Sequence, residues 1–299
     1  MISYLQSWPI VQKAILIVLR VLSSVAMRLY PAESPDKTVR LPSRDPKRTI
    51  RADVYTPKHP IRPSPLLINF HGGGFVLRMA GSDSKFCRKI ADSTPYTVID
   101  VDYRLAPEHP FPAALEDAED AIHWALKNNT EYDSSRIVLS GFSCGGNIAL
   151  VTSASWTFEH HPVRACVAFY PVCDLTRDPA EKTAPEQGLP QLPMFCYRMF
   201  DASYLGDDGD PRDPRVSPIN YDPDDFPKNL VLFTAAKDFL CMEGDHLAKN
   251  VGNTPGHNVL HQRFAQVGHA WDKRPTGDTS IQATDDAYST VVRVLNDTM

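Results

Sequence analysis

The feature that most restricts the fold of this chain is an alternation of short apolar runs with longer helical patterns. The apolar runs lie at residues 51–56, 65–70, 97–103, 136–141, 165–170, 230–236 and 258–264. Helical patterns separate many of them, most clearly at 113–129 and 146–158. Strands that alternate with helices pair in parallel, because each connecting helix crosses one face of the sheet. The sequence therefore predicts an α/β fold, with a mostly parallel central sheet and helices on both faces.

Size and charge narrow the class of protein. The chain has 299 residues, of which 42% are hydrophobic and 22% charged, and its formal net charge is −5. It is long enough to bury a substantial core, and it lacks the concentrated basic face of a nucleic-acid-binding protein. Its six cysteines form no C-x-x-C pair, and several lie in apolar segments. They predict a reducing, cytoplasmic environment and no metal site.

The N-terminal segment at residues 10–29 is strongly apolar but carries three basic residues. Lys13, Arg20 and Arg28 are separated by seven and eight residues, which places them on one narrow stripe of a helix. These charges argue against a membrane span. The segment is therefore predicted to form an amphipathic helix.

Two interpretations of this helix stay open. In the first, it packs over the rest of the protein. In the second, residues 10–30 contact a membrane surface, with Trp8 and Tyr30 near the two ends of the helix. A homodimer is compatible with either interpretation.

Two interruptions divide the chain. A Pro-rich, charged stretch at 30–48 follows the first helix, so residues 1–48 are expected to form an N-terminal cap helix and linker, and 49–299 the core. Residues 174–218 are too long for a plain connection, and long connections with their own structure are often lids. A cap insertion is expected there. Its apolar cluster fits either the border of an entrance or plain cap core: Met194, Phe195, Tyr197, Met199 and Phe200.

The hexapeptide GFSCGG at 141–146 offers two adjacent nucleophiles, Ser143 and Cys144. A strand pattern precedes it and a helix pattern follows, the context in which G-x-S-x-G forms a strained turn around an exposed central residue. That turn crowds the positions two before and two after its centre, which favours Gly141 and Gly145. A centre at Cys144 would put a phenylalanine at a crowded position. Ser143 is therefore the predicted nucleophile, and the Cys144 side chain is expected to pack inward.

A second glycine motif, HGGGF at 71–75, directly follows an apolar run. Consecutive glycines let backbone N–H groups approach a ligand oxygen, as in the oxyanion holes of lipases and esterases. Gly73 and Gly74 are the predicted donors, together with the backbone N–H of Cys144. His71 precedes the nucleophile in the chain, so it is expected to be structural.

A serine hydroxyl needs a base to take its proton and an acid to orient that base, in the chain order Ser, acid, His. Asp238 ends the apolar run 230–236, and His269 lies in a loop just after the last run. They are the predicted acid and base, with Glu243 as the alternative acid. Three other histidines occupy poorer positions for a base: His246, His257 and His261.

These motifs resemble the signature blocks of a known family, the hormone-sensitive-lipase-like branch of the α/β-hydrolases. Further blocks are DYRLAPEHPFPAALEDA at 102–118, DPRVSPI at 213–219 and TAAKDFLCMEGDHLA at 234–248. The resemblance runs from about residue 50 to the C-terminus. It implies an α/β-hydrolase core with a helical cap, and an esterase that acts on small acyl esters without a cofactor.

The resemblance also implies the roles of single residues. Ser143, Asp238 and His269 correspond to the family's catalytic triad. YRLAPE is a structural block in the family, so Arg104 and Glu108 are not expected to take part in chemistry.

The chain departs from the family pattern around the nucleophile and the base. Phe142 replaces a polar residue, Cys144 replaces alanine, and Ala270-Trp271 follows the histidine where Gly-Phe is usual. None of these changes removes a catalytic group. Phe142 and Trp271 are candidates for a changed pocket wall.

The predicted activity is that of a serine carboxylesterase hydrolysing small or medium acyl esters through an acyl-enzyme. The alternative is a natural-product tailoring enzyme that uses the same site as a deacetylase, or as a non-hydrolytic lyase or cyclase. A small-molecule receptor is disfavoured, because receptors on this fold often lose a triad residue and none is missing here.

Overall fold

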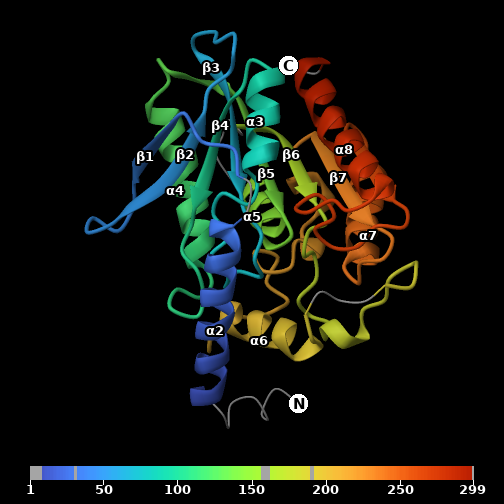
Figure 1. Ribbon diagram of the computed structural model, residues 1–299. Coiled ribbons are helices and arrows are strands. Elements are labelled where there is room, and N and C mark those ends of the chain that lie inside the picture. Colours follow the sequence, from blue (N-terminus) through green and yellow to red (C-terminus); the bar gives the residue numbers. More distant parts are fainter. Residues whose placement is uncertain (1–8, 30–31, 156–161, 189–191, 298–299) are drawn as a thin grey trace.

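The computed structural model describes residues 9–29, 32–155, 162–188 and 192–297, and one eight-stranded sheet forms its centre (Figure 1). The strand order is β1-β2-β4-β3-β5-β6-β7-β8. The strands are β1 Lys37–Pro42, β2 Thr49–Tyr55, β3 Ser64–Phe70, β4 Thr97–Asp102, β5 Tyr132–Phe142, β6 Val163–Phe169, β7 Asn229–Ala235 and β8 Asn258–Phe264. Strand β2 pairs antiparallel with both neighbours, and every other pair is parallel. The prediction of a mostly parallel sheet is confirmed.

Each of the seven predicted apolar runs coincides with one of the strands β2 to β8. Strand β1 was not predicted, because it lies in the Pro-rich stretch 30–48 that the sequence analysis interpreted as a linker. That interpretation is wrong for residues 37–42, which pair with β2 along their whole length. Strand β1 buries only Leu41, and its sequence KTVRLP alternates apolar with polar residues instead of forming an apolar run. Part of the core sheet therefore precedes the boundary expected at residue 48.

The helices cover both faces of the sheet, as predicted (Figure 1). They are α2 Pro9–Arg28, α3 Ser84–Ser93, α4 Ala113–Lys127, α5 Cys144–Ala154, α6 Met194–Leu205, α7 Cys241–Gly252 and α8 Asp278–Asp297. Buried side chains of α4, α5 and α7 belong to one core cluster, and those of α3 and α8 belong to a second. The two clusters lie on opposite faces of the sheet because alternate strand residues point to opposite sides.

The expected cap insertion contains α6 and a short 3₁₀ helix, Pro179–Glu181. Met199 and Phe200 of its apolar cluster are buried in the main core, whereas Phe195 is exposed. Helices α2 and α6 lie at the same end of the molecule (Figure 1). Trp8 and Tyr30, expected near the ends of the first helix, lie outside the described residues.

Candidate active site

Ser143 stands between the last residue of β5 and the first residue of α5. Its backbone has φ +55° and ψ −119°, a conformation that L-residues rarely adopt. Two backbone contacts hold the turn: the Ser143 N–H donates to the Phe169 carbonyl at 2.9 Å, and the Asn147 N–H donates to the Ser143 carbonyl at 3.1 Å. The hydroxyl therefore projects from a rigid corner at the carboxyl edge of the sheet.

The two glycines around Ser143 occupy crowded positions, as their spacing predicted. A Cβ atom built on Gly141 would lie 2.1 Å from the Gly145 carbonyl oxygen. A Cβ atom on Gly145 would lie 2.0 Å from the Phe70 carbonyl oxygen. Both obstacles are backbone atoms, so a larger side chain would have to distort the strand-to-helix turn.

Cys144, the rival nucleophile, is completely buried. Its Sγ atom lies 3.5 Å from the Tyr103 hydroxyl and 3.9 Å from the His71 carbonyl oxygen. Burial raises the pKa of the Cys144 thiol to about 11, although hydrogen bonds from Tyr103 and from backbone amides lower it. Because the thiolate is the reactive form of cysteine, a thiol that stays protonated near neutral pH is a poor nucleophile.

The segments that follow β7 and β8 bring the predicted acid and base to Ser143, at the end of β5. Asp238 follows β7 and His269 lies in the loop after β8, both at the same edge as the end of β5. The His269 Nδ1 atom lies 2.6 Å from Asp238 Oδ2, and its Nε2 atom lies 2.9 Å from Ser143 Oγ. The Asp238 carboxylate is 1% exposed and accepts a second hydrogen bond, from the Leu240 N–H at 3.0 Å. With Nδ1 held by the carboxylate, Nε2 is directed at the hydroxyl.

The glycine loop runs beside the same hydroxyl. A Cβ atom built on Gly72 would lie 3.5 Å from the Ser143 Cβ. Gly73 and Gly74 have φ values of +124° and +59°, which L side chains disfavour, and a Cβ on Gly74 would lie 2.4 Å from the Phe200 ring. The sequence GGG thus lets a strained loop pass between Ser143 and helix α6.

A family model described as alpha/beta hydrolase fold matches residues 67–273, which is more than half of the chain. The chain belongs to the α/β-hydrolase family. The resemblance to its hormone-sensitive-lipase-like branch is confirmed.

Known proteins similar to this hydrolase include an AB hydrolase superfamily protein of Schizosaccharomyces pombe, 34% identical over 56% of this chain and 50% of that protein. The 3-O-acetylpapaveroxine carboxylesterase CXE2 of Papaver somniferum is 46% identical over 28% of this chain and 32% of that enzyme. The hydrolase spans about half the length of the curated relatives it matches, or less. A hyperthermophilic esterase from the archaeon Pyrobaculum calidifontis has a similar structure, with a TM-score of 0.82, 29% identity, and coverage of 99% of this chain and 96% of that one.

The alternative acid and bases of this hydrolase lie elsewhere. Glu243 pairs with Lys182 at 2.7 Å and accepts the Cys173 N–H. His261 pairs with Asp245 at 2.9 Å, His257 lies 3.1 Å from the Phe226 carbonyl, and His246 is exposed on α7. His71 is buried and stacks on Tyr103 with a 4.5 Å centroid separation, which agrees with the structural role predicted for it.

Phe142 and Trp271, expected as changes in a pocket wall, are core residues instead. Phe142 is completely buried and stacks on Phe169 with a centroid separation of 4.3 Å. Trp271 is 5% exposed and packs against Tyr170 and Phe264. The pocket-wall expectation is wrong, because the residues before Ser143 and after His269 point toward the face covered by α3 and α8.

A buried polar network behind His269 was not predicted. The Tyr170 ring contacts the His269 ring edge to face at 4.7 Å, and its hydroxyl donates to Asp272 at 2.6 Å. Lys273 joins Asp272 to Asp83, with separations of 2.9 and 2.7 Å. Burial lowers the pKa of Lys273, but the two carboxylates outweigh it and raise the pKa above its usual range. The residues are dispersed in sequence, so no local motif marks the network.

Proposed function

We propose that this α/β-hydrolase is a serine carboxylesterase that hydrolyses small or medium acyl esters without a metal or cofactor. One observation carries the proposal. His269 stands between the Ser143 hydroxyl at 2.9 Å and the Asp238 carboxylate at 2.6 Å. This is the arrangement that activates a serine, since the base is in reach of the hydroxyl proton and the acid orients the base.

In the first half of the reaction, Ser143 Oγ attacks the ester carbonyl carbon while His269 Nε2 takes the hydroxyl proton. The carbonyl oxygen becomes an oxyanion, for which the backbone N–H groups of Gly73, Gly74 and Cys144 are the proposed donors. The tetrahedral intermediate then collapses as the bond to the alcohol oxygen breaks. His269 gives its proton to that oxygen, and the alcohol leaves an acyl-enzyme on Ser143.

In the second half, water replaces the alcohol. His269 takes a proton from the water as its oxygen attacks the acyl carbon, and the same N–H groups stabilise the second oxyanion. The bond to Ser143 Oγ breaks, the carboxylic acid leaves, and the proton returns to the serine. Asp238 stays ionised throughout and stabilises the imidazolium that forms in each half.

Hydrolysis of p-nitrophenyl acetate and butyrate tests this function. We expect Ser143→Ala to lower kcat by about 10³-fold or more, as for other triad nucleophiles. Ser280→Ala, in the first turn of α8 where the half-buried hydroxyl donates to the Thr276 carbonyl, is the matched control and should keep full activity. A fluorophosphonate should label Ser143, located by peptide mass spectrometry, and equal hydrolysis by both variants would reject the assignment.

A second candidate is a deacetylase of an acetylated natural product. Two similar proteins favour it by name: the 3-O-acetylpapaveroxine carboxylesterase of Papaver somniferum and a bacterial heroin esterase, which shares 26% identity and a TM-score of 0.80. Comparing acetate esters of bulky alcohols with p-nitrophenyl acetate would separate the candidates through kcat/KM. A lyase or cyclase would instead consume its substrate without releasing a carboxylic acid. The fluorophosphonate would still label Ser143 in such an enzyme.

A cytoplasmic location and a homodimer remain predictions. Cell fractionation tests the location. Size-exclusion chromatography with light scattering tests the dimer, which requires twice the 33.4 kDa mass of the chain.

A further inference from the structure

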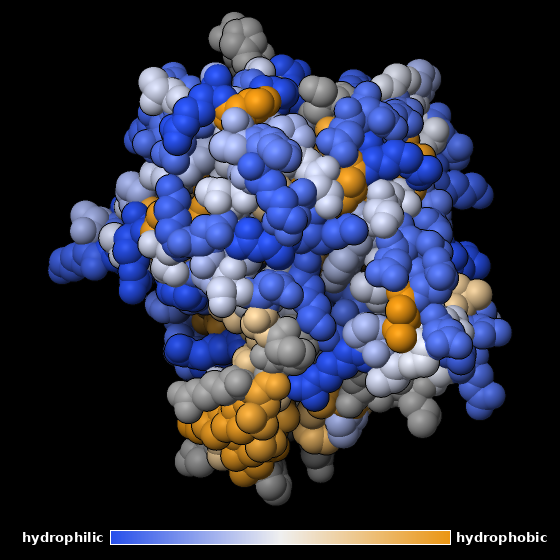
Figure 2. Space-filling model, turned by 45° about the horizontal axis from the view of Figure 1, so that its top comes forward, coloured by the Kyte–Doolittle hydropathy of each residue, from blue (hydrophilic) through white to orange (hydrophobic). Residues whose placement is uncertain are grey.

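Helix α2 presents aliphatic side chains to solvent along its outer side. The exposed residues are Val11, Ile17, Val18, Val21, Leu22, Val25 and, one residue beyond the helix, Leu29. Ile17 and Leu22 are about 60% exposed. Figure 2 shows an apolar patch that stands out from the hydrophilic surface around it. Among the described side chains of α2, only Leu16 is buried.

The inner side of α2 packs on the core through Ile15, Leu16 and Leu19, and one arginine adds hydrogen bonds to the protein. Arg20 Nε donates to the Val76 carbonyl at 2.9 Å, and Nη1 pairs with Glu108 at 2.6 Å. Its Nη2 atom donates to the Ala106 carbonyl. These contacts set the rotation of the helix, and they direct Arg20 inward instead of to solvent. A helix that is apolar on its outer side needs a cover there, because an aliphatic stripe is stable against an apolar phase and not against water.

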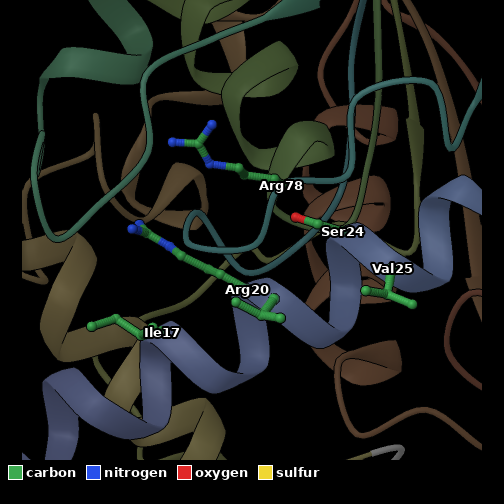
Figure 3. A pocket seen from close by; sticks show the side chains of 6 residues that line it. Ile17, Arg20, Ser24, Val25 and Arg78 are labelled. Atoms are coloured by element: carbon green, nitrogen blue, oxygen red, sulfur yellow. The ribbon is translucent and has the colours of Figure 1, made fainter.

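The stripe adjoins the candidate active site. Val76, which receives Arg20, lies two residues beyond Gly74 in the glycine loop. A hollow of about 400 Å³ lies between α2 and Arg78 and is lined by Ile17, Val21 and Val25 of the stripe together with Arg20, Ser24 and Arg78 (Figure 3). Apolar material that covers α2 would therefore lie beside the loop proposed to bind the oxyanion.

We propose that the outer side of α2 docks on an anionic lipid surface, from which the enzyme takes lipophilic esters. The substrate class in this inference rests on the proposed esterase function, whereas the docking does not. Besides Arg20, which pairs with Glu108, residues 1–32 contain two basic residues, Lys13 and Arg28, and no Asp or Glu, although the chain as a whole carries −5. A segment that is both aliphatic and positively charged fits acyl chains under anionic headgroups.

The helix lies on the surface and does not cross it. No helix in the described part of the chain is long and apolar enough to span a bilayer. A second copy of the chain is a poorer cover, because protein interfaces are anchored by aromatic and arginine side chains and depleted in Val and Leu hot spots. Among the residues that the structure describes, the large exposed side chains of the stripe are all Val, Leu or Ile.

Flotation with vesicles tests the docking on the full chain. The probes are vesicles of phosphatidylcholine alone and of phosphatidylcholine with about one-third phosphatidylglycerol. We expect binding to the anionic vesicles that weakens at high salt. The double variant Val18→Ser/Leu22→Gln should bind at least about tenfold more weakly, because it removes two inserted aliphatic side chains.

The matched control places the same kind of change on another exposed site. Met242→Gln/Ile281→Gln alters two exposed aliphatic residues of α7 and α8, and it should bind vesicles like the unmodified chain. Equal binding by both double variants, or no binding by the unmodified chain, overturns the docking. Dimerisation through α2 would also overturn the docking. It would be detected as a molecular mass that falls from dimer to monomer only in the Val18→Ser/Leu22→Gln variant.

An activity measurement separates this inference from the proposed function. Hydrolysis of dissolved p-nitrophenyl acetate should be the same in both double variants, since neither touches Ser143. Hydrolysis of a long-chain ester embedded in the anionic vesicles should fall about tenfold in the α2 variant only. Equal rates on the embedded ester overturn the substrate class. Loss of all hydrolysis with intact vesicle binding would instead refute the esterase and leave the docking standing.

Discussion

Helices α5 and α2 are both strongly apolar, but α5 is buried and much of α2 is exposed. Every residue of α5, Cys144–Ala154, is buried, and its first turn supports the strained Ser143. Helix α2 buries one described side chain and exposes six large aliphatic ones. An apolar helix face must be shielded from water. The sequence of the helix does not show whether the rest of the protein or an external phase shields it.

The largest effect on stability is expected from adding a side-chain atom to α5 at a position where backbone atoms fill the surrounding space. Gly145→Ala would put a Cβ atom 2.0 Å from the Phe70 carbonyl, and backbone on both sides prevents relaxation. We expect a loss of more than about 4 kcal/mol of stability, seen as a fall of about 10 °C or more in Tm. Gly252→Ala on α7, whose Cβ would make ordinary contacts from 3.5 Å, is the control and should change Tm little.

Burial of an ionisable side chain in the core also makes the stability of the protein depend on pH. Burial and, to a smaller extent, the neighbouring Asp83 together raise the pKa of Asp100 to about 8. Because the folded protein keeps a proton that the unfolded chain releases above its ordinary pKa of 3.8, stability falls as the pH rises toward 8. Asp100→Asn should flatten the decline in Tm between pH 5 and pH 9.

Asp133→Asn is the control for this pH experiment. Burial raises the pKa of Asp133, but hydrogen bonds from Ser135 and Arg136 lower it below its ordinary value. It therefore titrates outside the tested range, and its variant should keep the unmodified pH profile. Identical profiles for all three proteins would contradict the proton on Asp100.

A smaller, local effect is expected on α2. Arg20→Ala removes the contacts to Val76, Ala106 and Glu108, so the helix should open more readily while the sheet stays folded. Limited proteolysis should cut within α2 at least about tenfold faster, since cleavage follows the free energy of local opening. Arg293→Ala, exposed on α8, should digest like the unmodified chain. A large fall in global Tm would mean that α2 belongs to the cooperative core.

The smallest effect is expected from the side chain next to the nucleophile. Cys144→Ala keeps the backbone N–H proposed for the oxyanion and removes only a buried thiol. We expect kcat for p-nitrophenyl acetate to fall less than about tenfold. A loss as large as that of Ser143→Ala would show that the thiol takes part in the reaction.

Much of the site follows from local rules. A strand-to-helix turn crowds its neighbours over two residues, so the glycine spacing alone pointed to Ser143, and the structure places Asp238 and His269 beside it. Strands β2 to β7 form apolar runs because most of their side chains are buried. Of the two edge strands, β8 keeps an apolar pattern although only Phe264 is buried, whereas β1 buries only Leu41 and lies in a Pro-rich stretch.

The tertiary structure decided what depends on residues far apart in the chain. The network of Tyr170, Asp272, Lys273 and Asp83 joins separate elements, and each residue alone is an ordinary polar residue. The direction of the Arg20 side chain also depends on residues far away in the chain. Helical spacing placed Arg20 on one side of the helix, but only the carbonyls of Val76 and Ala106, more than fifty residues away, direct the Arg20 side chain inward. Periodicity defines the sides of a helix, and the partners that fold against it decide which side is covered.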